Sequence, residues 1–113
     1  MPVATAVDAH AKRGTNCAQA VLCGFQELLG LPDERIAAAT VHGGGRAPEG
    51  TCGALHAALS LTDEPEAKLA IESRFVAQAG ALSCREVLKL GKLTCRDCVR
   101  LAAELVQEQF ATR

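Results

Sequence analysis

The segment from Thr94 to Phe110 reads TCRDCVRLAAELVQEQF, and its pattern predicts an amphipathic helix. Its apolar residues recur at intervals of three and four, which places them on one face of a helix. Thr94 belongs to the residue types that cap helix starts. We expect this helix to turn its apolar face, headed by Cys95 and Cys98, toward the core of the protein. The rest of that face comprises Val99, Ala102, Leu105, Val106 and Phe110.

Helix signals of the same kind run through the whole chain. Alanine and leucine are abundant, and capping residues or glycines mark the expected helix ends. The expected helices cover about residues 3–13, 16–29, 33–40, 51–61, 65–80, 84–90 and 95–109. An irregular segment, HGGGRAPEGTCG at 42–53, interrupts them. The sequence therefore predicts an all-α fold, a single domain over residues 1–113 built as a compact bundle of six or seven mostly short helices with a glycine-rich loop.

Composition and charge exclude several classes of partner. The chain has 113 residues, of which 49% are hydrophobic and 22% charged, as in an ordinary globular domain. Twelve Lys and Arg against thirteen Asp and Glu leave a net charge of -1, which argues against binding to nucleic acid. No apolar run approaches the roughly 18 residues that a membrane span needs. We therefore expect neither nucleic acid nor membrane among the partners.

Cysteine usage is the unusual feature of the composition, with six in so short a chain. The first residues, MPVATAVDAHAKRG, lack the basic start and apolar stretch of a secretory signal, so we expect a cytoplasmic protein. In a reducing compartment, persistent structural disulfides are uncommon. The cysteines are therefore candidates for redox chemistry, for metal ligation, or for burial as small apolar residues.

Four cysteines share one local context, because each follows a capping residue at the start of an expected helix. The exposed amides at a helix start stabilise a thiolate and lower the pKa of a thiol. Cys23 falls away from the apolar face of its helix, and we interpret it as a bystander. The four cysteines are Cys17, Cys52, Cys84 and Cys95. The apolar face that begins at Cys17 continues through Val21, Gly24, Phe25 and Leu28.

Two functional hypotheses follow, besides simple packing. In the redox hypothesis, a site lined by the four cysteines performs thiol–disulfide exchange or electron transfer, and no cofactor is required. The exchanging pair would be Cys95 with Cys98, or Cys52 with Cys84. The partner would be a redox protein or a small thiol, and the chain could form a homodimer. In the metal hypothesis, the thiols bind zinc or an iron–sulfur cluster, and the protein has a non-catalytic role as a carrier or sensor. The ligands would be Cys17, Cys52, Cys84 and Cys95, with His56 as a further candidate.

The glycine-rich segment also has two interpretations. The amides of glycines 43–45 could hold an anion, but the plainer interpretation is that these glycines permit tight turns beside Cys52. His42 opens this segment and could reach the same site. Cys52 and His56 lie one turn apart on one helix, which rarely gives the geometry of a cysteine hydrolase.

Taken together, the cysteine motifs resemble a family of small redox-active proteins named for its C_GCAxxG_C_C pattern. The matching stretches are NCAQAV at 16–21, CGA at 52–54, SC at 83–84 and CRDCV at 95–99. The resemblance places the family's four cysteines at Cys17, Cys52, Cys84 and Cys95, with Cys23 and Cys98 as additions. Ala57 stands where the motif closes with glycine. The resemblance implies a redox or metal role and no particular substrate.

Overall fold

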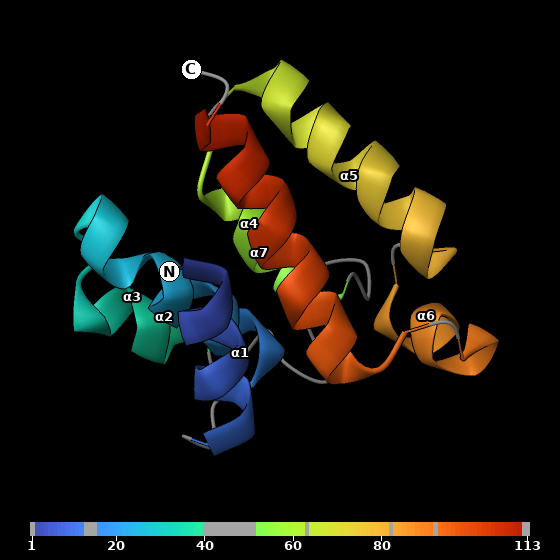
Figure 1. Ribbon diagram of the computed structural model, residues 1–113, viewed down its shortest axis with the longest axis horizontal. Helices are drawn as coiled ribbons and strands as arrows, with labels where there is room; N and C mark the ends of the chain where they lie inside the picture. The colour runs from blue at the N-terminus through green and yellow to red at the C-terminus, as the bar shows by residue number, and fades with distance from the viewer. Residues whose placement is uncertain are drawn as a thin grey trace.

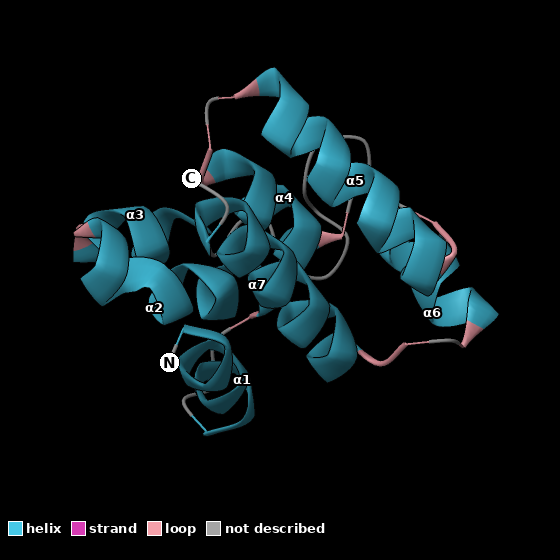
Figure 2. Ribbon diagram, turned by 45° about the horizontal axis from the view of Figure 1, so that its top comes forward, coloured by secondary structure: helices cyan, strands magenta, loops and turns pink. Residues whose placement is uncertain are grey.

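Seven α-helices and no strand make up the part of the chain that the computed structural model describes (Figures 1 and 2). That part comprises residues 2–12, 16–39, 52–62, 64–81, 83–91 and 93–111. The predicted all-α fold is confirmed. The helices are α1 (Pro2–Lys12), α2 (Cys17–Leu29), α3 (Asp33–Ala38), α4 (Gly53–Ser60), α5 (Pro65–Ala79), α6 (Cys84–Leu90) and α7 (Cys95–Ala111).

The ends of α2 show why the predicted boundaries are accurate. Asn16 and Gln19 form a capping box, in which the Gln19 N–H donates to Asn16 Oδ1 at 2.7 Å and the Asn16 N–H donates to Gln19 Oε1 at 3.2 Å. At the other end, Gly30 adopts a left-handed conformation with φ +66°. Because only glycine adopts this conformation without strain, the helix ends there.

The start of α4 differs from the prediction by one residue. We expected Cys52 inside the first turn, but the helix begins at Gly53 and Cys52 is its N-cap. The ψ angle of Cys52 is 129°, which is outside the helical range. The side chain of an N-cap residue lies beside the free amides of the first turn, so this shift brings the thiol closer to them than the prediction implied.

The core forms where α7 packs against α1, α2, α4 and α5. Figure 1 shows α7 crossing the molecule, with α4 directly behind it and α1 to α3 on one side. Fully burying one large side chain contributes about 1.5–3 kcal/mol to stability. The largest side chains with almost no exposure are Phe25, Phe75, Leu55, Ile71, Val21, Val87 and Val99.

Two predictions about α2 are wrong. Leu28 was expected on the buried face but is 62% exposed, because the last turn of α2 projects beyond the helices that cover the rest. Cys23 was expected to point away from the core, yet it is half-buried and packs against it. The buried arc of α2 is wide because α1, α3, α4 and α7 all contact this helix.

The described helices include none with both the length and the apolar character required to cross a membrane.

Candidate functional site

Three cysteines come together where α2, α4 and α7 meet. Cys17 is the first residue of α2, Cys52 is the N-cap of α4, and Cys98 lies at the end of the first turn of α7. Their exposed fractions are 4%, 4% and 2%, and all three belong to the same core cluster. None of them is in a disulfide. We call Cys17, Cys52 and Cys98 the thiol cluster.

Within the thiol cluster, Cys98 has the largest effect on Cys52. The thiol of Cys98 hydrogen-bonds to the sulfur of Cys52. This hydrogen bond is the largest of the effects that lower the pKa of Cys52 below its ordinary value of 9.0. A hydrogen bond to a thiolate favours the charged form. The contact with Cys98 therefore favours the thiolate form of Cys52.

Other groups around Cys52 act on the same pKa in both directions. Burial raises it, because a charged sulfur loses hydration. The backbone N–H of Leu55 and, to a smaller extent, that of Ala54 lower the pKa, although the thiol forms no capping hydrogen bond of normal geometry. The negative charge that Cys17 can carry raises it. The net shift is downward, so the helix start and Cys98 together outweigh burial.

The position of Cys17 is fixed by the residues that precede and follow it. The capping box of Asn16 and Gln19 defines the start of α2, and both side chains continue to α3. Asn16 Nδ2 donates to the carbonyl of Ala39 at 3.3 Å, and Gln19 Nε2 donates to the carbonyl of Ile36 at 3.3 Å. These hydrogen bonds join the start of α2 to the end of α3 and so hold Cys17 in the cluster.

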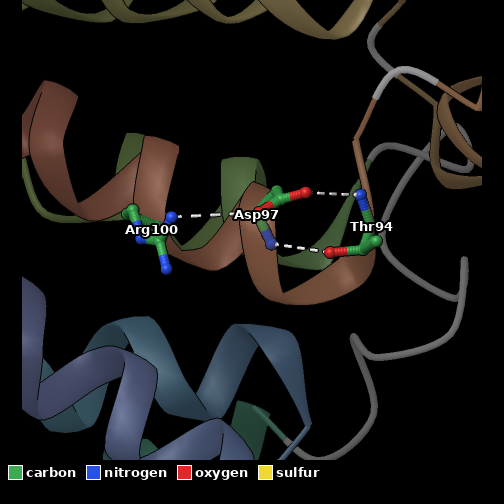
Figure 3. Close-up of polar contacts among 3 residues, drawn as sticks. All are labelled: Thr94, Asp97 and Arg100. Carbon is green, nitrogen blue, oxygen red and sulfur yellow. Dashed lines mark hydrogen bonds and ion pairs between the residues drawn. The ribbon is translucent and has the colours of Figure 1, made fainter.

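A second capping box directly precedes Cys98 in the chain, and Figure 3 shows its two residues, Thr94 and Asp97. The Thr94 N–H donates to Asp97 Oδ2 at 3.1 Å, and the Asp97 N–H donates to Thr94 Oγ1 at 3.1 Å. The backbone N–H of Thr94, followed by its hydroxyl, lowers the pKa of Asp97 below 3.8. On the exposed side of the helix, Arg100 Nη1 lies 4.0 Å from Asp97 Oδ1. The residue after Asp97 is Cys98, so this cap sets the direction in which α7 presents its thiol.

Cys84 and Cys95 begin α6 and α7, as the sequence predicted. Ser83 caps α6, because its hydroxyl accepts the N–H of Glu86 at 3.2 Å. The side chains of Cys84 and Cys95 lie outside the described part of the structure. The predicted pairings of Cys95 with Cys98 and of Cys52 with Cys84 therefore remain predictions.

The contact between Cys52 and Cys98 is the feature that sequence reasoning missed. The resemblance made Cys98 an addition to the family pattern, but in the structure Cys98 hydrogen-bonds to Cys52 and lowers its pKa. The available signal was the place of Cys98 at the head of the apolar face of its helix. That signal indicated burial, but no pattern in the sequence indicated which helix start would face it.

His56 lies on α4 one turn after Cys52 and faces a small pocket instead of the thiol cluster. The pocket has a volume of about 180 Å³, and none of the described cysteines lines it. Among the described residues, the three cysteines of the thiol cluster included, no three potential ligands are grouped closely enough to hold a metal ion. His42 and glycines 43–45 lie outside these residues. The pocket is lined by Ala18, Leu22, Arg35, Ala38, Ala39, His56, Ala57 and Ser60.

Comparison of the sequence with models of known protein families identifies the family to which the chain belongs. The model described as "Putative redox-active protein (C_GCAxxG_C_C)" matches residues 15–109. The chain therefore belongs to this family, and the resemblance noted from its cysteine motifs is confirmed. Searches of curated proteins and of solved structures gave no match. The match includes all three helix starts that form the thiol cluster.

Proposed function

We propose that this member of the C_GCAxxG_C_C family performs thiol–disulfide redox chemistry by cycling Cys52 and Cys98 between dithiol and disulfide. The observation that carries the proposal is the hydrogen bond from the Cys98 thiol to the sulfur of Cys52 at the start of α4. The thiolate is the nucleophile in exchange, and a second thiol in contact with it can close the disulfide. The family description supports a redox role in general terms.

The exchange proceeds in two balanced steps. The Cys52 thiolate attacks one sulfur of an oxidised partner, and the second partner sulfur leaves as a thiolate. Cys98 then loses its proton and attacks the sulfur of Cys52, which releases the first partner sulfur. The chain has lost two electrons and two protons, and the partner disulfide has become two thiols. The reverse sequence reduces the chain again, with a redox protein or a small thiol in the cytoplasm as donor.

The test is to map the disulfide that forms on mild oxidation. The reduced protein is equilibrated in glutathione buffers of graded potential, quenched with an alkylating reagent, and analysed as peptides by mass spectrometry. We expect a Cys52–Cys98 disulfide that forms and disappears reversibly. Substituting Cys52→Ser or Cys98→Ser should abolish it, whereas Cys23→Ser, which changes a half-buried cysteine outside the cluster, should leave it unchanged.

Two results would overturn this assignment. A reversible disulfide between Cys95 and Cys98, or between Cys52 and Cys84, would transfer the exchange to one of the pairs that the sequence predicted. Zinc or iron bound to anaerobically purified protein, and lost in Cys52→Ser, would support the metal hypothesis, because ligation would occupy the proposed nucleophile.

A further inference from the structure

We propose that a small hydroperoxide, rather than the disulfide of another protein, oxidises the thiol cluster. This inference rests on the proposed function: it keeps the Cys52–Cys98 disulfide as the oxidised form and replaces attack on a partner disulfide with attack on a peroxide as the oxidising step. It follows from the contrast between two observations at one place. Cys52 and Cys98 are in hydrogen-bond contact, as a pair that forms a disulfide should be, yet only 4% and 2% of their surfaces are exposed.

Burial restricts the oxidant because exchange has a strict geometry. The attacking sulfur must approach along the line of the bond that breaks, and the rate depends on access to that sulfur. A protein disulfide carries a carbon chain on each of its two sulfurs. To align it with Cys52, that chain would have to enter the region where α2, α4 and α7 pack together. These helices include some of the most buried side chains of the molecule, among them Leu55 and Val99.

A hydroperoxide avoids this difficulty, since its terminal oxygen carries only hydrogen. The Cys52 thiolate attacks that oxygen, the O–O bond breaks, and an alkoxide or hydroxide leaves and takes a proton from water. Cys52 is then a sulfenic acid. The Cys98 thiol attacks its sulfur, the S–O bond breaks, and the oxygen leaves as water with the proton of Cys98. The products are the Cys52–Cys98 disulfide, one water and one alcohol, or a second water when the oxidant is hydrogen peroxide.

The neighbourhood of Cys52 suits this sequence of steps. The backbone N–H groups of Leu55 and Ala54 favour the attacking thiolate. Cys98 hydrogen-bonds to the sulfur that becomes oxidised, so the thiol that completes the second step is already beside it. Two small thiols would complete the cycle by reducing the disulfide.

The experiment compares oxidants on the folded and the unfolded chain. Reduced protein is mixed with hydrogen peroxide, tert-butyl hydroperoxide, oxidised glutathione or oxidised thioredoxin, and the Cys52–Cys98 disulfide is counted by quenched mass spectrometry. Each rate is divided by the rate of the same oxidant with the chain in denaturant, which removes differences in intrinsic reactivity. For hydrogen peroxide we expect the rate with the folded chain to equal or exceed the rate with the unfolded chain, a ratio of one or more. For thioredoxin we expect a ratio about 100-fold lower, because access to the sulfur limits exchange.

A ratio for thioredoxin equal to that for hydrogen peroxide would overturn the inference and leave the proposed function intact. A Cys52–Cys98 disulfide that forms with none of the four oxidants would overturn the proposed function itself. A second measurement uses Cys98→Ser, in which the sulfenic acid at Cys52 has no partner. We expect this sulfenic acid to accumulate after peroxide treatment in Cys98→Ser and not in Cys23→Ser, and to be trapped as a dimedone adduct when the reaction is stopped in denaturant. Because the rate ratios use the natural chain, they decide the question even if Cys98→Ser does not fold.

Discussion

At the scale of single residues, the thiol cluster contains two neighbours of Cys52 with opposite effects. Cys98 lowers the pKa of Cys52 by donating a hydrogen bond, and Cys17 raises it through its negative charge. We therefore expect Cys98→Ala to raise the pKa of Cys52 and Cys17→Ala to lower it. The carbon-13 shift of Cys52 Cβ, followed against pH in cysteine-labelled protein, measures this pKa directly.

The matched control for both substitutions is Cys23→Ala, which removes a thiol from α2 outside the cluster and should leave the titration of Cys52 unchanged. If Cys98→Ala and Cys17→Ala shifted the pKa in the same direction, loss of packing would be the dominant effect. The hydrogen bond from Cys98 would then no longer explain the lowered pKa.

The chemistry of single residues was predictable from the sequence to a limited degree. The pattern of a capping residue followed by a cysteine correctly predicted that Cys17, Cys84 and Cys95 lie at helix starts. It misplaced Cys52 by one position because Thr51, a good capping residue, precedes it. The pKa of Cys52 depends chiefly on Cys98, which is 46 positions further along the chain, so no local pattern could supply it.

At the scale of the helix, the start of α7 depends on the charge of Asp97. The pKa of this carboxyl is lowered in the folded protein by the N–H and hydroxyl of Thr94. A lowered pKa means that the ionised form favours folding, so the contribution is complete above the unfolded pKa of about 3.9. It is lost as the pH falls through the lowered pKa of Asp97. We expect the first turn of α7, including Cys98, to open more readily in acid.

Amide hydrogen exchange of the first turn of α7, corrected for the intrinsic effect of pH, measures this opening. In Asp97→Asn, which keeps an acceptor oxygen without the charge, exchange at neutral pH should resemble that of the natural chain in acid. Glu104→Gln removes an exposed charge further along the same helix and is the control. Equal protection in Asp97→Asn and in the natural chain at neutral pH would show that the cap does not need the charge.

The helices themselves were predictable because their ends carry strong local signals. Capping boxes precede α2 and α7, and a left-handed glycine ends α2, α5 and α6. The exposure of Leu28 was not predictable, because periodicity shows which face of a helix is apolar but not where its neighbours end. The half-burial of Cys23 has the same origin, since four other helices contact α2.

At the scale of the whole molecule, the site arises from the packing of α7 against both α2 and α4. The sequence predicted three inward-facing cysteines at helix starts, but it contained no information on which starts would meet. The contact between Cys52 and Cys98 spans α4, α5 and α6 in the chain. Its formation therefore depends on the complete fold, and the redox state of the pair should in turn affect the stability of the complete fold.

The size of this effect follows from the loop that the Cys52–Cys98 disulfide would close. Constraining the unfolded chain over a loop of about 45 residues stabilises the folded state by about 2–4 kcal/mol in the chain-entropy account. For a domain of this size we expect a rise in Tm of about 10 °C on oxidation. Calorimetry of the reduced and oxidised protein tests this, with Cys98→Ser treated in the same way as the control. Because Cys98 already hydrogen-bonds to Cys52, the disulfide should form with little distortion of the helices. A fall in Tm on oxidation would mean that the bond strains the packing of α4 against α7, and that the dithiol is the form to which the fold is adapted.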